Sequence, residues 1–311
     1  MFDPVQTTEN NKTSEYEVLA NSKIVDIDWY LRNRRTRQQK LIAELPRHIE
    51  NNELDLYYQP QIDLRTGKTL SVEALVRWQD RFAGTIAPHM FVPLAEQCGH
   101  IIKLTDWVID NSLWQLSKWK SRGVELDVAV NLSVCNFDDY SLPVKISRFL
   151  DKWSIPARRL ILEVTEGVMI KNMDQAIKIL LELSNQGIKL SLDDFGSGCS
   201  SLSYLSTLPI SELKIDRSLV MDMDKNYKNR TIVQSTIELA KRLGLGVVAE
   251  GVENISTYNI LTLFNCDTAQ GFYFCKPVRS EVITSWLFES DWGMLPRGRT
   301  NVQKGQSRNV S

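Results

Sequence analysis

The chain has 311 residues, of which 43% are hydrophobic and 24% charged, a composition typical of a folded globular protein. Its 37 basic and 38 acidic residues give a net charge of -1, which excludes bulk attraction to a nucleic-acid polymer or an anionic membrane. The sequence has no run of ~18 apolar residues that would span a membrane, no secretory signal, and no CxxC pair among its five cysteines. We therefore expect a cytoplasmic protein with reduced thiols.

The two ends of the chain differ in composition from its middle. Residues 1–28 are polar and lack a sustained period, which predicts a flexible N-terminal arm. Residues 29–50 show a helical apolar stripe and begin the segment 29–290, which we expect to be one folded domain. Residues 291–311 are rich in Gly, Pro, Arg, Asn and Ser, and we expect a disordered tail there.

Strand-like runs alternate with helix-period segments from residue 53 onward. The helical segments that end at Gly123, Gly187 and Gly244 close on the residue that usually ends a helix. This alternation predicts an α/β fold, a TIM-like (β/α)8 barrel. The eight predicted strands are 54–60, 69–78, 125–133, 159–166, 188–195, 212–218, 246–252 and 269–274.

The first two predicted strands break the alternation. Only the turn-like segment Arg65–Lys68 joins them, and it is too short to hold a crossover helix. A hairpin is therefore expected, and one barrel strand should run antiparallel to its neighbours.

Acidic residues follow the apolar runs of several predicted strands. In a barrel of this kind the C-terminal ends of the strands meet at one mouth, where active sites are found. A single acid there is more often a helix cap or part of a buried salt bridge. So many together favour a site for hard divalent cations, and hence two-metal hydrolysis of a phosphate ester. The residues are Glu73, Asn131, Glu163, Glu166, Asp193, Asp194 and Glu250.

Several segments resemble, in order, the motifs of the EAL family of cyclic di-GMP-specific phosphodiesterases. The resemblance extends from about Glu53 to Glu289 and implies hydrolysis of cyclic di-GMP to linear pGpG, with effects on biofilm and motility. The matching segments are Glu73-Ala74-Leu75, Asn131-Leu132-Ser133, Glu163-Val164-Thr165-Glu166, Asp193-Asp194-Phe195-Gly196, Leu213-Lys214-Ile215-Asp216, Ala249-Glu250-Gly251-Val252-Glu253 and Gln270-Gly271-Phe272.

The resemblance also implies roles for individual residues. Two ions, Mg²⁺ or Mn²⁺, would be held by Glu73, Asn131, Glu163, Asp193, Asp194 and Glu250. Glu73, Glu250 and Lys214 would be catalytic, with Lys214 orienting or activating a water. Gln59, Arg77 and Gln270 would contact the substrate. Glu166 would anchor the loop that follows Asp194, at residues 195–201.

Some questions stay open at the level of sequence. A neutral Lys214 could accept a proton from water, whereas a protonated one could only orient it. Ser197 and Cys199 depart from the usual residues of the loop, and Cys199 is more simply a packing residue than a redox switch. Phe272 is equally consistent with core packing and with packing on a guanine.

The alternative to an active enzyme is a non-catalytic EAL-like receptor for cyclic di-GMP, or a protein-binding regulator. Every position that the family uses for catalysis holds the expected residue type, which favours the enzyme. The resemblance implies a homodimer. Since residues 1–50 leave no room for a sensor domain, we expect a stand-alone catalytic domain whose control requires expression, dimerisation or an unidentified regulatory protein.

Overall fold

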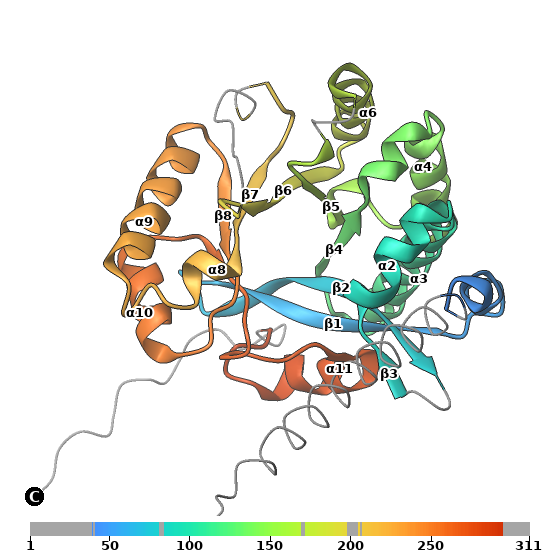
Figure 1. Ribbon diagram of the computed structural model, residues 1–311. Helices are drawn as coiled ribbons and strands as arrows, with labels where there is room; N and C mark the ends of the chain where they lie inside the picture. Colours follow the sequence, from blue (N-terminus) through green and yellow to red (C-terminus); the bar gives the residue numbers. More distant parts are fainter. Residues whose placement is uncertain are drawn as a thin grey trace, which may run out of the picture.

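Eight strands close into a barrel in the computed structural model, which describes residues 39, 41–80, 84–168, 172–197, 205 and 207–294 (Figure 1). The predicted TIM-like fold is thus confirmed. The barrel strands are β1 (Leu54–Asp63), β2 (Lys68–Asp80), β4 (Asp127–Leu132), β5 (Leu160–Thr165), β6 (Lys189–Phe195), β7 (Glu212–Ile215), β8 (Gly246–Ala249) and β9 (Thr268–Ala269). Two short strands, β3 (Gly84–Ile86) and β10 (Val278–Arg279), pair with β2 and β1 outside the ring.

Strand β1 is the antiparallel member of the barrel. It pairs in the antiparallel sense with both β2 and β9, while β2 and β4 through β9 pair in parallel around the rest of the ring. The turn that joins β1 to β2 is too short for a crossover, so the chain reverses directly. As a result Gln59 of β1 lies opposite Glu73 of β2.

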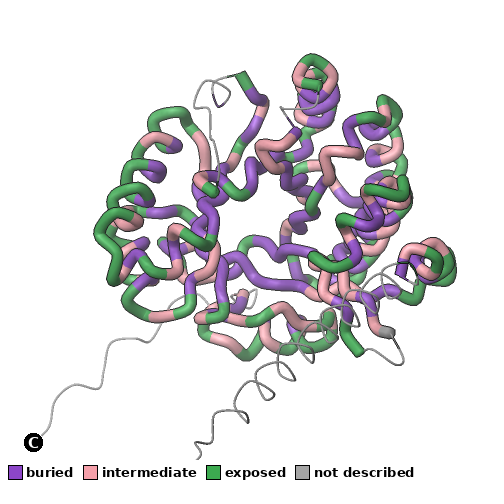
Figure 2. The backbone as a smooth tube through the Cα atoms, in the orientation of Figure 1, coloured by how far each residue is buried: buried purple, intermediate pink, exposed green. Residues whose placement is uncertain are grey.

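Helices surround the ring of strands (Figure 1). Their inward faces are buried and their outward faces exposed, so the core lies between helices and barrel as well as inside the barrel (Figure 2). Residues 41–50 form a further helix. The bounds are α2 Pro88–Gln97, α3 Ile101–Ser121, α4 Leu142–Trp153, α6 Met173–Asn185, α8 Arg217–Val220, α9 Tyr227–Arg242, α10 Ile255–Leu263 and α11 Ser280–Glu289, with the 3-10 turns η1 Val134–Asp138 and η2 Ala157–Arg159.

The last barrel strand is shorter than the sequence pattern predicts. Strand β9 ends at Ala269, whereas we expected a strand over 269–274. The chain turns at Gly271, where a Cβ atom would lie 2.0 Å from the carbonyl oxygen of Val252. Backbone passes over backbone at this point, and only glycine permits such an approach. Residues 272–274 therefore form a turn instead of continuing the strand.

The segment 291–294 packs against the folded domain, so the prediction of a disordered tail from residue 291 is wrong for these four residues. The Trp292 ring lies 5.0 Å from Phe274 and 5.3 Å from Tyr258 between ring centroids. Its carbonyl oxygen accepts hydrogen bonds from Thr69 N at 3.0 Å and Thr69 Oγ1 at 2.8 Å. Trp292 thus attaches the end of the domain to the β1–β2 hairpin. Residues 295–311 and the expected arm 1–28 lie outside the described residues.

We predict that Trp292→Ala lowers the free energy of unfolding by about 2 kcal/mol, because a large aromatic side chain leaves a packed cluster. Urea unfolding followed by circular dichroism measures this change. Trp114→Ala is the matched control, since Trp114 is exposed and Lys118 lies over its ring. It should cost less than about 1 kcal/mol. Equal losses in the two variants would show that Trp292 does not anchor the hairpin.

Candidate active site

The residues that the sequence places at strand ends converge on the mouth of the barrel. Glu73 lies on β2, Asn131 on β4 and Glu163 on β5, with Asn131 and Glu163 directly paired between their strands. Asp193 and Asp194 lie near the end of β6, Lys214 lies on β7, and Glu250 and Gln270 directly follow β8 and β9. Because side chains alternate along a strand, such positions aim one polar side chain per strand into the barrel.

Lys214 occupies the centre of this group and is 0% exposed. Its Nζ lies 2.7 Å from Glu250 Oε1, 2.9 Å from Glu163 Oε1 and 3.2 Å from Asp193 Oδ1. Glu73 Oε2 is a fourth oxygen at 4.0 Å. Four carboxylates from four different strands or strand ends therefore face one buried ammonium group. None of them would be stable in the barrel interior without a cation.

The pKa values of these groups reflect burial and mutual charge. Burial alone would lower the pKa of Lys214, but the four surrounding carboxylates together raise it well above its usual value. Burial, followed by the charges of its acidic neighbours, raises the pKa of Glu163 in spite of Lys214. Burial likewise raises the pKa of Glu250 to about 7. Lys214 is therefore protonated in the metal-free protein, and the site holds more negative charge than one ammonium can balance.

Side-chain amides fix the orientation of Glu73. Asn131 Nδ2 donates to Glu73 Oε1 at 2.8 Å, and Gln270 Nε2 donates to Glu73 Oε2 at 2.6 Å. Gln270 Nε2 also donates to Gln59 Oε1 at 3.0 Å, and Gln59 Nε2 donates to the carbonyl oxygen of Cys275 at 3.1 Å. With its NH₂ group engaged, Asn131 directs its Oδ1 atom away from Glu73, where that oxygen can accept another partner.

The donor set fits hard divalent cations. Oxygen atoms of Asp193, Asp194 and Glu250 lie within 4.8 Å of one another. Glu163 Oε2 is buried and accepts no hydrogen bond from the part of the chain that the structure describes. An orphaned buried carboxylate oxygen beside an all-oxygen cluster is what a cation such as Mg²⁺ or Mn²⁺ would satisfy. The residues present are therefore suited to the metals that the sequence implies.

A local turn holds Asp194 at the edge of this cluster. Its backbone has φ +57°, a left-handed conformation that asparagine and aspartate tolerate better than most residues. Its N–H donates to Asp193 Oδ1 at 3.0 Å, and its carbonyl oxygen accepts from Ser197 Oγ at 2.8 Å. Burial and the Asp193 charge raise the pKa of Asp194 to about 6. The hydroxyl of Ser197 thus helps to keep two acids adjacent.

Some predicted residues are not brought onto the cluster. The Arg77 guanidinium donates to the carbonyl oxygen of Val76 at 2.9 Å and lies 5.5 Å from the centroid of the Tyr57 ring, so its contact with substrate stays a prediction. Glu166 lies in the turn after β5. The loop that it was expected to anchor continues into residues 198–204, which include Cys199 and are outside the described residues. The anchoring role is therefore a prediction too.

Two polar residues of this region were missed in the sequence. Arg217 follows β7 at the mouth and, with Gln59, Glu73, Asp193, Glu250, Gln270 and Phe272, lines a cavity of about 210 Å³. Its position two residues beyond a strand end was the available signal. Gln61 lies inside the barrel and contacts both Glu163 and Gln270. It shares the inward face with Gln59, which an alternation argument could have found. Phe272 at the cavity rim is 52% exposed, which excludes core packing.

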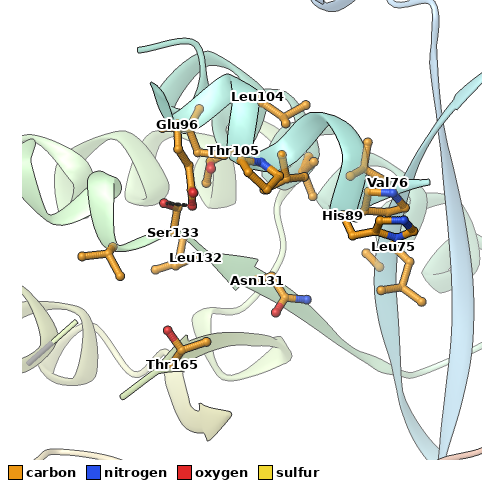
Figure 3. Close-up of a pocket in the computed structure, with 17 residues that line it drawn as sticks. Leu75, Val76, His89, Glu96, Leu104, Thr105, Asn131, Leu132, Ser133 and Thr165 are labelled. Atoms are coloured by element: carbon orange, nitrogen blue, oxygen red, sulfur yellow. Dashed lines mark hydrogen bonds between the residues drawn. The ribbon is translucent and has the colours of Figure 1, made fainter. Parts of the chain in front are cut away.

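A second, larger and mainly apolar cavity has a volume of about 410 Å³ (Figure 3). Leu75 lines both this cavity and the acidic one. The apolar cavity lies between α2, α3, the middle of β2 and the ends of β4 and β5. The side chain of Asn131 points into the space between Leu75 and Thr165 (Figure 3). Ser133 Oγ donates to Glu96 Oε1 at 2.7 Å, which joins the end of β4 to α2. The mouth therefore has an acidic half and an apolar half.

Comparison with known proteins identifies the class of this barrel. The EAL domain family matches residues 42–277, most of the chain, so the protein belongs to the EAL family. The cyclic di-GMP phosphodiesterase PA2567 of Pseudomonas aeruginosa is 36% identical to it over 248 residues, which are 79% of this chain and 42% of that protein. The oxygen sensor protein DosP of Escherichia coli is 37% identical over 246 residues, 79% of this chain and 31% of its own length.

Solved structures show the same likeness. The chain is similar to the PaMucR phosphodiesterase in complex with c-di-GMP, with a TM-score of 0.75 and 38% identity over 78% of this chain and 99% of that one. This chain spans less than half the length of the curated relatives described above. In the part of the chain that the structure describes, no helix combines the length and apolarity that crossing a membrane requires.

We predict that Lys214→Met destabilises the metal-free protein by about 3–5 kcal/mol, because it leaves the surrounding carboxylates without their cation. Thermal unfolding in EDTA measures the loss. Added Mn²⁺ should restore about 2.7 kcal/mol at a hundredfold excess over its dissociation constant. The control Lys152→Met removes an exposed ion pair of 2.8 Å with Asp110 and should cost less than about 1 kcal/mol. A Lys214 variant as stable in EDTA as the native protein would contradict the role of the buried ammonium.

Proposed function

We propose that this chain is a metal-dependent phosphodiesterase that hydrolyses cyclic di-GMP to linear pGpG and so lowers the level of the second messenger. The observation that carries the proposal is the buried cluster around Lys214, where four carboxylates exceed the charge that one ammonium can balance. Excess negative charge at a barrel mouth suits two divalent cations. Relatives named cyclic di-GMP phosphodiesterases support the choice of substrate.

Glu73, Asn131, Glu163, Asp193, Asp194 and Glu250 would hold the two ions, Mg²⁺ or Mn²⁺. Two ions, when bound, supply charge neutralisation at the phosphodiester and a water of lowered pKa. In the metal-free protein the surrounding carboxylates raise the pKa of Lys214. As an ammonium, Lys214 would orient the attacking water and oppose the negative charge that develops at phosphorus. Bound cations would lower this pKa, and a neutral Lys214 would instead accept a proton from the water. Arg217 at the cavity wall is placed to contact a phosphate oxygen.

The two halves of the mouth suggest how the substrate lies. Its phosphodiester belongs in the acidic cavity beside Glu73 and Asp193, and one guanine enters the apolar cavity beyond Leu75. Exposed Phe272 offers a ring face to the other guanine at the opposite rim. Gln59 and Gln270 lie between the two and position the reacting part of the substrate.

The decisive experiment is a chromatographic assay of the purified protein with cyclic di-GMP and Mg²⁺ or Mn²⁺. We expect pGpG from the native protein. Glu73→Ala should lower the rate at least about 1,000-fold, which corresponds to about 4 kcal/mol of lost transition-state stabilisation. Native protein that binds the nucleotide without cleaving it would instead establish the alternative function, a cyclic di-GMP receptor. Equal turnover by both proteins would refute the metal site.

We further predict that Val92→Trp raises the KM for cyclic di-GMP about 10-fold and changes kcat little, because Val92 lines the apolar cavity and a larger side chain would fill it. Steady-state kinetics in Mn²⁺ measure the two constants. Val144→Trp is the matched control, since Val144 is 47% exposed on α4 and should leave both constants unchanged. If Val92→Trp had the same KM as the native protein, the guanine would not bind in the apolar cavity.

Three parts of the proposal concern the protein as a whole. A homodimer, an unidentified regulatory partner and a cytoplasmic location all remain predictions. Sedimentation velocity at several protein concentrations tests the first of them.

A further inference from the structure

Gln61 lies in the interior of the barrel, in contact with Glu163 and Gln270. It is on β1, is 1% exposed, and is paired with Ser71 of β2. The pairing register shifts immediately after it, between Gln61 and Ile62. Such an irregularity re-aims the side chains around it and is common beside active sites. Gln61 belongs to none of the segments that carry the family resemblance.

The hydrogen bonds of Gln61 have a defined direction. Ser71 Oγ donates to Gln61 Oε1 at 2.5 Å, so the carbonyl end of the amide faces β2. The NH₂ end must then face the other way, where Nε2 donates to Gln270 Oε1 at 3.0 Å and approaches Glu163 Oε1 at 3.5 Å. A serine hydroxyl can accept as well as donate, so the selection between the two orientations of this amide comes from the Glu163 carboxylate, which can only accept.

This selection is passed on to a second amide. Because Gln270 Oε1 accepts from Gln61, the NH₂ group of Gln270 is left to donate, and it donates to Glu73 Oε2 at 2.6 Å. If Gln270 were reversed, its carbonyl oxygen would face the Glu73 carboxylate and repel it. The chain from Ser71 through Gln61 and Gln270 to Glu73 therefore has one stable direction.

Gln61 also contacts the other side of the site directly. Its NH₂ group approaches the Oε1 atom of Glu163, the oxygen that faces Lys214, and leaves Oε2 without a hydrogen bond from the described residues. One buried amide therefore restrains the carboxylate of Glu163 and, through Gln270, that of Glu73. These two residues come from strands on opposite sides of β4.

We propose that Gln61 is a positioning residue of the metal centre, which sets the orientation of Glu163 and Glu73 before a divalent cation binds. The inference rests on the proposed function only in requiring that these residues bind the cation. It makes no use of the nucleotide.

The test measures Mn²⁺ binding in the absence of nucleotide, from the electron paramagnetic resonance signal of free Mn²⁺. Gln61→Leu should weaken Mn²⁺ binding about 10-fold, as loss of a hydrogen bond to a metal ligand typically does. The control Ser191→Ala removes another buried hydrogen bond of the barrel interior, from Ser191 Oγ to Glu212 Oε1 at 2.9 Å. It should bind Mn²⁺ as the native protein does. The melting temperatures of the metal-free variants give their folding cost separately.

A coupling measurement separates positioning from a general loosening of the fold. If part of the effect passes through Gln270, Gln61→Leu should weaken Mn²⁺ binding less in a Gln270→Met background than in the native chain. Full additivity would overturn the chain of hydrogen bonds described above. Should Gln61→Leu fail to fold, Gln61→Met tests the same chain, since methionine keeps an unbranched side chain of similar length and removes only the amide.

The proposal is overturned if Gln61→Leu binds Mn²⁺ with an affinity within twofold of that of the native protein. If Gln61→Leu does not fold, the same result for Gln61→Met overturns it. A native protein that binds Mn²⁺ but leaves cyclic di-GMP intact refutes the proposed function alone, and the variants still decide the role of Gln61. A native protein that binds no Mn²⁺ overturns both.

Discussion

The ion cluster around Lys214 is the constraint on which the rest of the mouth depends. A buried ammonium group costs several kcal/mol in desolvation unless carboxylates surround it, and each carboxylate has the same need. Nζ distances of 2.7, 2.9 and 3.2 Å to Glu250, Glu163 and Asp193 satisfy both requirements. These acids reach the lysine only because a closed barrel directs the ends of separate strands to one point. The fold and the charge cluster therefore support each other.

The antiparallel strand contributes a different chemistry to the same ring. Along β1 the inward positions hold Gln59 and Gln61, neutral amides that donate and accept hydrogen bonds without adding charge. Further acids on β1 would raise the repulsion around Lys214, and apolar residues would leave Gln270 without its acceptor and donor partners. The hairpin places Gln59 opposite Glu73 and Gln61 opposite Ser71, so the register of one turn determines which amide meets which acid. The antiparallel direction of β1 and the polar residues on its inward face therefore act together in orienting the acids of the site.

The sequence was sufficient for the ring and for its acids, because apolar runs that end in Glu or Asp are a local pattern. From a turn too short for a helix it predicted that one barrel strand is antiparallel, and the structure shows that this strand is β1. It also selected Glu73, Glu163, Asp193 and Glu250, which the structure brings together. It could not place features that depend on contacts between distant segments. The sequence around Trp292 is typical of a disordered tail, and only the contacts with Phe274 and Tyr258 show that this residue is packed. Similarly, β9 is short because Gly271 crosses over the backbone of Val252. A glutamine such as Gln61 is not unusual in a strand, and only its contact with Glu163 in the folded barrel indicates a role in the site.

The asymmetry of the mouth bears on the choice between an enzyme and a receptor. Nucleotide binding alone would be served by the apolar cavity beyond Leu75, the amides of Gln59 and Gln270, and a cation such as Arg217. Buried acids add nothing to that task, since they repel a phosphodiester and lower stability unless cations compensate them. Their retention around Lys214, with an oxygen of Glu163 left without a hydrogen bond from the described residues, is costly for a receptor. It is useful to a protein that recruits divalent cations, and this favours catalysis over binding alone.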